Sequence, residues 1–126
     1  MLHQLQQRAN EALSTARQIV LSAFGPADIQ AESLSCESVG LALYALVPRT
    51  SDLLFNLESR ALVVVTADTW QARGTARLLA AHEYPEGLAI TGTSAASWSE
   101  MVEIRPTRLQ LRPRPGQAQG ETIDIS

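Results

Sequence analysis

Short turns separate most of the apolar segments in this 126-residue chain, and they limit the folds that it can adopt. Residues 19–24 and 29–36 are joined by Gly25-Pro26-Ala27-Asp28, and residues 41–47 follow after Glu37-Ser38-Val39-Gly40. Turns of this length connect antiparallel strands, whereas parallel strands need a crossover connection of a dozen or more residues. The pattern therefore predicts a mainly β protein with an antiparallel sheet.

The strands of this predicted sheet differ in whether one or both of their faces are apolar. Residues 29–36 alternate, with Ser33 on one face and Glu32 on the other. Residues 41–47 are apolar on both sides, which indicates a strand buried on both faces. Residues 61–67 form a Val-rich strand, and residues 70–80 form a long strand in which Gly74 marks a β-bulge. With six or seven strands expected, an antiparallel barrel is favoured.

Helical patterns occur at the N-terminus and after Pro48. An amphipathic helix is predicted from apolar residues at helical spacing, namely Leu2, Leu5, Ala9, Ala12, Leu13 and Ala16. A second, short helix over residues 53–58 has three candidate N-caps in Thr50, Ser51 and Asp52.

The C-terminal third is harder to interpret. Residues 82–99 are expected to form a loop with one short helix. Residues 101–104 and 107–111 are predicted as two strands split by Pro106, with residues 113–120 as a flexible loop before a short strand at 122–125. Length and composition favour one domain over residues 1–126.

Charge and residue usage exclude several functions. The net charge of −3 gives no electrostatic basis for binding nucleic acid or an anionic membrane. No signal peptide or membrane-spanning segment is recognisable, so a cytoplasmic location is expected. All ten basic residues are Arg, which excludes lysine-based catalysis. Cys36 is the single cysteine and is expected to be buried, and His3 and His82 are far apart, so no metal site is predicted.

The order of these segments resembles the pyridoxamine 5'-phosphate oxidase-like FMN-binding split-barrel family over nearly the whole chain. The segments that carry the likeness are "GLALYALVPRTS", "NLESRALVVV", "WQARGTARLL" and "VEIRPTRLQL". They are punctuated by Gly40, Tyr44, Asn56-Leu57, Gly74 and Arg105-Pro106. The resemblance implies an antiparallel split barrel with an N-terminal helix, assembled as a homodimer with flavin sites between the subunits. One side of residues 41–47 is then expected to face the barrel interior and the other to meet the partner.

The same resemblance implies a site for the FMN phosphate where the third strand ends and the short helix begins. On this pattern Arg49, Thr50 and Ser51 are the expected contacts, because a phosphate dianion needs charge-assisted donors. The other expected contacts are Ser33, Trp70 and Arg73, the last two from across the dimer interface. Leu53 stands where the family has Lys or His, and Glu32 stands at a donor position.

Two functions follow from this interpretation. The first is an FMN-dependent oxidoreductase of unknown substrate, in which no catalytic acid or base is identifiable. The alternative is a cofactor-free split-barrel dimer that binds a small ligand or serves in subunit assembly.

Overall fold

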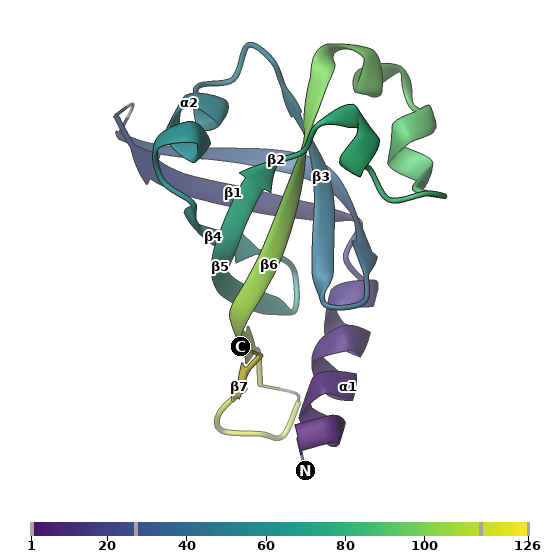
Figure 1. Cartoon of the computed structure of the whole chain (residues 1–126). Helices are drawn as coiled ribbons and strands as arrows, with labels where there is room; N and C mark the ends of the chain where they lie inside the picture. Colours follow the sequence, from purple (N-terminus) through teal and green to yellow (C-terminus); the bar gives the residue numbers. More distant parts are fainter. Residues whose placement is uncertain (1, 27, 114, 126) are drawn as a thin grey trace.

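The computed structural model describes residues 2–26, 28–113 and 115–125, in which six antiparallel strands close into a barrel (Figure 1). The order around the barrel is β3-β2-β1-β4-β5-β6, and pairing of β3 with β6 closes it. The strands are β1 (Gln18–Gly25), β2 (Asp28–Val39), β3 (Ala42–Pro48), β4 (Leu62–Thr66), β5 (Trp70–Leu78), β6 (Ser99–Leu111) and β7 (Glu121–Asp124). The predicted antiparallel split barrel with an N-terminal helix is therefore confirmed.

The long strand β6 has two different partners along one of its edges. Its residues 99–104 pair with β3, whereas residues 108–111 pair with β7 on the same edge. Strand β5 pairs with residues 102–111 of β6 on the other edge. The predicted C-terminal strand is thus confirmed as an addition to the sheet, outside the closed ring.

Pro106 does not split this strand, which corrects the prediction of two separate strands. It lies opposite Gly74, where the register between β5 and β6 shifts as expected for a β-bulge. A Cβ atom at Gly74 would lie 2.4 Å from the carbonyl oxygen of Arg105. The bulge and the missing side chain at Gly74 together let a proline, which lacks an N–H donor, stand inside a strand.

Two helices lie at different ends of the barrel (Figure 1). Helix α1 (Leu2–Ser14) buries Ala9 and Leu13, and helix α2 (Asp52–Ser59) buries Leu53 and Leu57. Ser51 is the N-cap of α2, because its Oγ accepts a hydrogen bond from the backbone N–H of Leu53 at 3.1 Å. Among the described helices, none has the length and apolar character needed to cross a bilayer.

The barrel interior holds the main core, and its members come from alternate positions of the strands. They include Ile19, Leu21, Leu43, Val47, Val65, Trp70, Ile104 and Leu109, each at most 2% exposed. Cys36 is also buried there, and its burial raises the pKa of the thiol to about 11, so the thiol stays protonated near neutral pH. The expectation of a buried cysteine is confirmed.

The outward side of β3 is covered by the chain's own segment between β5 and β6. This segment contains three short 3₁₀ helices, η1 (Ala81–Glu83), η2 (Ala89–Gly92) and η3 (Ser94–Trp98), instead of the single helix predicted there. Its Leu88 and Ile90 pack with Tyr44, Leu46 and other buried residues. The expectation that this side of the strand meets a partner subunit is therefore wrong, since the same chain already covers it.

Candidate functional site

Arg49, the first residue expected to contact phosphate, is held by its own chain. Its Nε lies 3.1 Å from Oε1 of Glu100, and its Nη1 donates to the carbonyl oxygen of Ser97 at 2.9 Å. Thr50 follows in an exposed turn. The guanidinium therefore bridges the end of β3 to the start of β6 and already has an anionic partner.

Ser51 is likewise committed to partners within the chain. Its Oγ caps α2 and also donates to Oε1 of Glu32 at 2.5 Å. A cavity of about 520 Å³, which we call the α2 cavity, lies beside this cluster and is lined by Arg49, Ser51, Leu54, Phe55, Glu58, Leu78 and Glu100. Its lining includes two carboxylates and one guanidinium, and that guanidinium is paired with one of the two. These residues do not fit the phosphate of FMN, because its charge would meet carboxylates where it needs donors.

The structure separates the remaining predicted residues from this cavity and from one another. Ser33 and Arg73 both point outward from the barrel, on β2 and β5. Strands β1 and β4 lie between them, so the two backbones are roughly 14 Å apart at the usual strand spacing. A single phosphate cannot contact both residues of one chain together with Arg49 or Ser51.

Trp70 belongs to the core. Its ring is 1% exposed, and its Nε1 donates to the carbonyl oxygen of Ala12 at 3.1 Å, which anchors α1 to the barrel. The expected contact of Trp70 with a flavin across an interface is incompatible with this burial. The indole is a packing residue that also satisfies its own N–H group.

A different surface stands out on the outward side of β1, β2, β4 and β5, which we call the outer face. Four large apolar side chains are exposed there: Val20 at 39%, Phe24 at 53%, Ile29 at 66% and Leu62 at 57%. Phe24 and Ile29 are direct cross-strand partners, and Val20 pairs in the same way with Ser33. Alternation along each strand places these residues opposite the barrel core, so they gather on one surface.

The outer face is hollowed into a cavity of about 700 Å³, the outer-face cavity, whose lining is mostly apolar. It is lined by Ser22, Ala23, Phe24, Ile29, Arg60, Leu62, Val63, Val64, Arg73, Gly74 and Thr107. The Arg60 guanidinium carbon lies 5.9 Å from the centre of the Phe24 ring, within the range of a cation–π contact. Within the described part of the chain, no carboxylate forms an ion pair with Arg60 or Arg73. Of the six residues predicted to bind the cofactor, only Arg73 lines this cavity.

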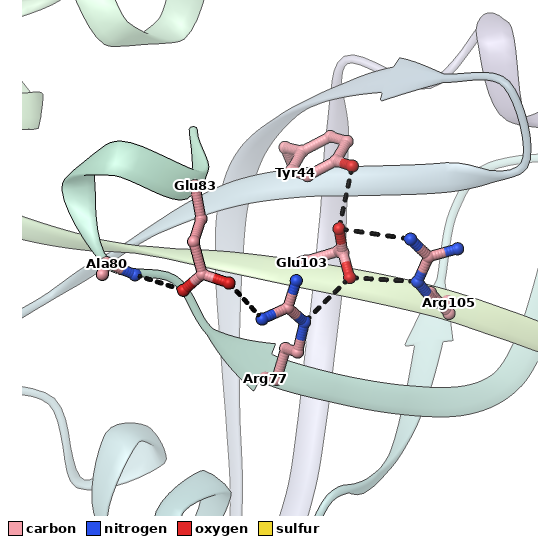
Figure 2. Close-up of polar contacts among 6 residues, drawn as sticks. All are labelled: Tyr44, Arg77, Ala80, Glu83, Glu103 and Arg105. Carbon is pink, nitrogen blue, oxygen red and sulfur yellow. Dashed lines mark hydrogen bonds and ion pairs between the residues drawn. The ribbon is translucent and has the colours of Figure 1, made fainter. Parts of the chain in front are cut away.

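Sequence reasoning missed a second group, a charged network on the outward side of β3, β5 and β6 (Figure 2). Glu103 is 5% exposed, and its carboxylate accepts hydrogen bonds from Tyr44 at 3.0 Å, Arg77 at 3.1 Å and Arg105 at 3.0 Å. Arg77 also contacts Glu83 at 2.6 Å, and the other oxygen of Glu83 accepts from the Ala80 N–H at 3.0 Å. The network ties η1 to the barrel and thereby holds the segment that covers β3.

The carboxyls of this network are stabilised in their charged form. Burial alone would raise the pKa of Glu103, but hydrogen bonds from Tyr44, Arg105 and Arg77 together lower it below its ordinary value. The pKa of Glu83 is lowered by hydrogen bonds from the Ala80 backbone and from Arg77. The pKa of Tyr44 is raised by burial and by its hydrogen bond to Glu103, so the phenol keeps its proton. The network is thus a structural clamp in its fully paired state, with no poised acid or base.

This network predicts acid sensitivity. A carboxyl whose pKa is lowered by folding contributes stability above its unfolded pKa, near 4.3, and that contribution is lost as the pH falls through the folded value. A Glu103→Gln variant should be less stable by about 1–2 kcal/mol at pH 7, a figure discounted because both arginines are largely exposed. Its stability should also fall less steeply between pH 5 and pH 3, as measured by urea unfolding. Equal pH slopes for this variant and for the exposed control Glu86→Gln would contradict the clamp.

The described residues offer no cluster of three or more His, Cys, Asp or Glu side chains that could hold a metal ion. Two of the potential ligands, Cys36 and Glu103, are instead committed to the core and to the clamp.

Several solved structures share this fold. One is a protein related to general stress protein 26, of the pyridoxinephosphate oxidase family, from Clostridium acetobutylicum, with a TM-score of 0.70 and 10% identity over 97% of this chain and 95% of that chain. General stress protein 26 from Bacillus anthracis matches with a TM-score of 0.65 and 14% identity over 94% of this chain and 98% of that one. A heme binding protein from Mycobacterium smegmatis matches with a TM-score of 0.69 and 13% identity over 95% of this chain and 57% of that one.

These matches establish a split barrel of the pyridoxamine 5'-phosphate oxidase-like type over the whole chain. No protein-family model matches the sequence, and no curated protein matches it either. At 10–14% identity, these matches show a shared fold and nothing about a shared function. The proteins with this fold are themselves described by different functions.

Proposed function

We propose that this chain is a split-barrel dimer that binds a flat, anionic ring ligand in the outer-face cavity, with Arg60 and Arg73 as the charged contacts. The observation that carries the proposal is the position of these two guanidinium groups beside an apolar hollow of about 700 Å³. A cavity of this size with mostly apolar walls and a few polar groups is typical of small-molecule sites.

The exposed apolar side chains of the outer face support the dimer in this proposal. Ile29, Leu62 and Phe24 are each more than half exposed and lie on one side of a continuous sheet. Apolar side chains gathered in this way mark interaction surfaces on soluble proteins. A second copy docked on this face would exclude water from the cavity and strengthen the contact of its arginines with an anionic group.

The lining of the cavity favours a flavin over a heme. Phe24, Ile29, Leu62 and Val64 offer apolar contacts to a ring, and arginine forks suit a phosphate or carboxylate. None of the described lining residues is His, Cys, Met or Tyr, the side chains that ligate heme iron. When bound, a flavin supplies hydride or electron transfer, while the protein binds and orients it. We therefore propose FMN as the ligand and a flavin-dependent oxidoreductase as the activity, with Arg73 nearer to the phosphate than Arg49.

Ligand titration tests this assignment. Arg73→Gln should weaken FMN binding at least tenfold, because it removes a charge-assisted contact, whereas Arg49→Gln should leave the affinity unchanged. Arg112→Gln, an exposed arginine at the end of β6, is the matched control. Binding is measured by quenching of flavin fluorescence and by absorbance near 450 nm, with riboflavin and hemin as separate arms. Loss of FMN affinity in Arg49→Gln alone would place the phosphate in the α2 cavity and refute the outer-face site.

A cofactor-free assembly module is the second candidate, and the large exposed fractions of Ile29 and Leu62 favour it. In that case the outer face serves self-association alone. A protein that is dimeric, colourless and unresponsive to FMN, riboflavin and hemin would support this candidate over the first.

A further inference from the structure

We infer that Glu32 and Glu100 determine the specificity of the α2 cavity by closing it to phosphate. Each carboxylate occupies a donor group that a phosphate would otherwise use. The inference concerns a different cavity from the one proposed for the ring ligand, and it does not depend on that proposal.

The first closure is the contact between β2 and the start of α2. Glu32 is half-buried on the inward side of β2, and its Oε1 lies 2.5 Å from the Ser51 Oγ. The same Oγ already accepts from the Leu53 N–H. The Ser51 hydroxyl therefore donates its hydrogen bond to a carboxylate, and its oxygen accepts one from a backbone N–H at the N-terminus of α2.

The second closure is the contact between β3 and β6. Arg49 is the cationic residue among the described residues that line the α2 cavity, and Glu100 pairs with it at 3.1 Å. Its Nη1 is directed to the Ser97 carbonyl oxygen at 2.9 Å. A phosphate would have to displace a paired carboxylate and a backbone acceptor to reach this guanidinium.

The remaining charges act in the same direction. Glu58 adds a further carboxylate to the cavity lining, and Asp52 is the first residue of α2. The positive end of the helix dipole is therefore already compensated by the chain's own acids. The local charge is negative even with Arg49 included, so a dianion is repelled.

The arrangement explains why a helix N-terminus, an arginine and a serine hydroxyl lie together without forming an anion site. Glutamine keeps the shape and hydrogen-bonding capacity of glutamate but not its charge. A Glu32→Gln/Glu100→Gln variant should therefore keep the fold and expose the latent donors Arg49 and Ser51. We expect at least a tenfold gain in phosphate affinity, since two like charges at contact distance are removed.

Inorganic phosphate is the probe, and its binding is measured by ³¹P NMR line broadening and by the rise in Tm at constant ionic strength. Addition of Arg49→Gln to the double variant should abolish the gain, whereas addition of Arg112→Gln, at an exposed arginine with no assigned role, should not. Glu11→Gln/Glu86→Gln makes the same change of net charge at exposed positions and should gain nothing. The inference is overturned if the unchanged chain already binds phosphate through Arg49, or if the Glu32→Gln/Glu100→Gln variant gains no affinity.

Discussion

An Ile29→Glu variant should be monomeric at protein concentrations at which the unchanged chain is a dimer. Ile29 is 66% exposed on β2 and lies directly opposite Phe24 on β1, in the apolar part of the outer face next to the β1–β2 turn. In the proposed dimer the new carboxylate would be buried without a partner, which costs several kcal/mol. We expect the dissociation constant to rise by two or more powers of ten. Sedimentation velocity over a concentration series measures it.

The control uses the same chemical change on another surface. Phe55 is 54% exposed on α2 and lines the α2 cavity instead of the outer-face cavity, so Phe55→Glu should leave the dimer intact. Both variants replace a solvent-exposed apolar residue and should keep their circular dichroism spectra. A dimer that survives Ile29→Glu, or an unchanged chain that is monomeric at about 100 µM, would refute self-association through this face.

The barrel was predictable because its signals are local. The turn after Gly25 and the turn at Gly40 set antiparallel pairing, and each holds few enough residues to be recognised by composition. Gly74 marked the bulge for a steric reason that the structure makes plain, since the Arg105 carbonyl oxygen occupies the place of its side chain. Apolar residues on both sides of β3 also indicated a strand covered on both faces.

What covers a strand is not a local property. The outward side of β3 is packed by residues 81–98, more than thirty positions later in the chain. That segment has no helical or strand periodicity, because 3₁₀ helices of three to five residues are too short to repeat an apolar pattern. The resemblance to a dimeric family led to the expectation that a partner subunit covers the outward side of β3, whereas residues of the same chain cover it.

The contacts within the candidate site could not be predicted from the sequence for a related reason. Arg49 and Ser51 were correctly placed at the end of β3 and the start of α2. Their partners, Glu100 and Glu32, are 51 and 19 positions away, and no spacing rule connects them. The outer face could have been predicted from the alternation of residues along its strands. Phe24 and Leu62 adjoin the buried residues Ala23 and Val63 along their strands, so apolar side chains at these positions point to solvent or to a partner.

Asn56→Ala should be among the most destabilising substitutions in the chain, at about 3 kcal/mol. Asn56 is fully buried in α2, and its Nδ2 donates to the carbonyl oxygens of Ala23 at 3.2 Å and Asp28 at 2.7 Å. These bonds fasten the helix to both ends of the β1–β2 turn. A Cβ atom at Gly25 would lie 2.9 Å from the Asn56 Oδ1, so the turn and the side chain are in close contact. Truncation leaves two carbonyl groups without their donors, at about 1–3 kcal/mol each.

Urea unfolding measures the loss, and Asn10→Ala is the matched control. Asn10 is exposed on α1, where alanine has the higher helix propensity, so this substitution should be neutral or slightly stabilising. Equal stabilities for the two variants would show that Asn56 does not fasten the turn.

Asn56→Asp separates the hydrogen bonds from the packing. Aspartate fills the same space, but its carboxylate only accepts and would face two carbonyl oxygens in a buried position. Burial and these acceptors raise the pKa of such a group above the unfolded value of about 3.9, so the folded state holds the proton more tightly. The free energy of unfolding of Asn56→Asp should then fall as the pH rises. This variant should be less stable than Asn56→Ala at pH 7 and should regain part of its stability at pH 4. Glu103 and Glu83 stay in both proteins, so the difference that Asn56→Asp makes is a loss of stability between pH 4 and pH 7 that the unchanged chain should not show.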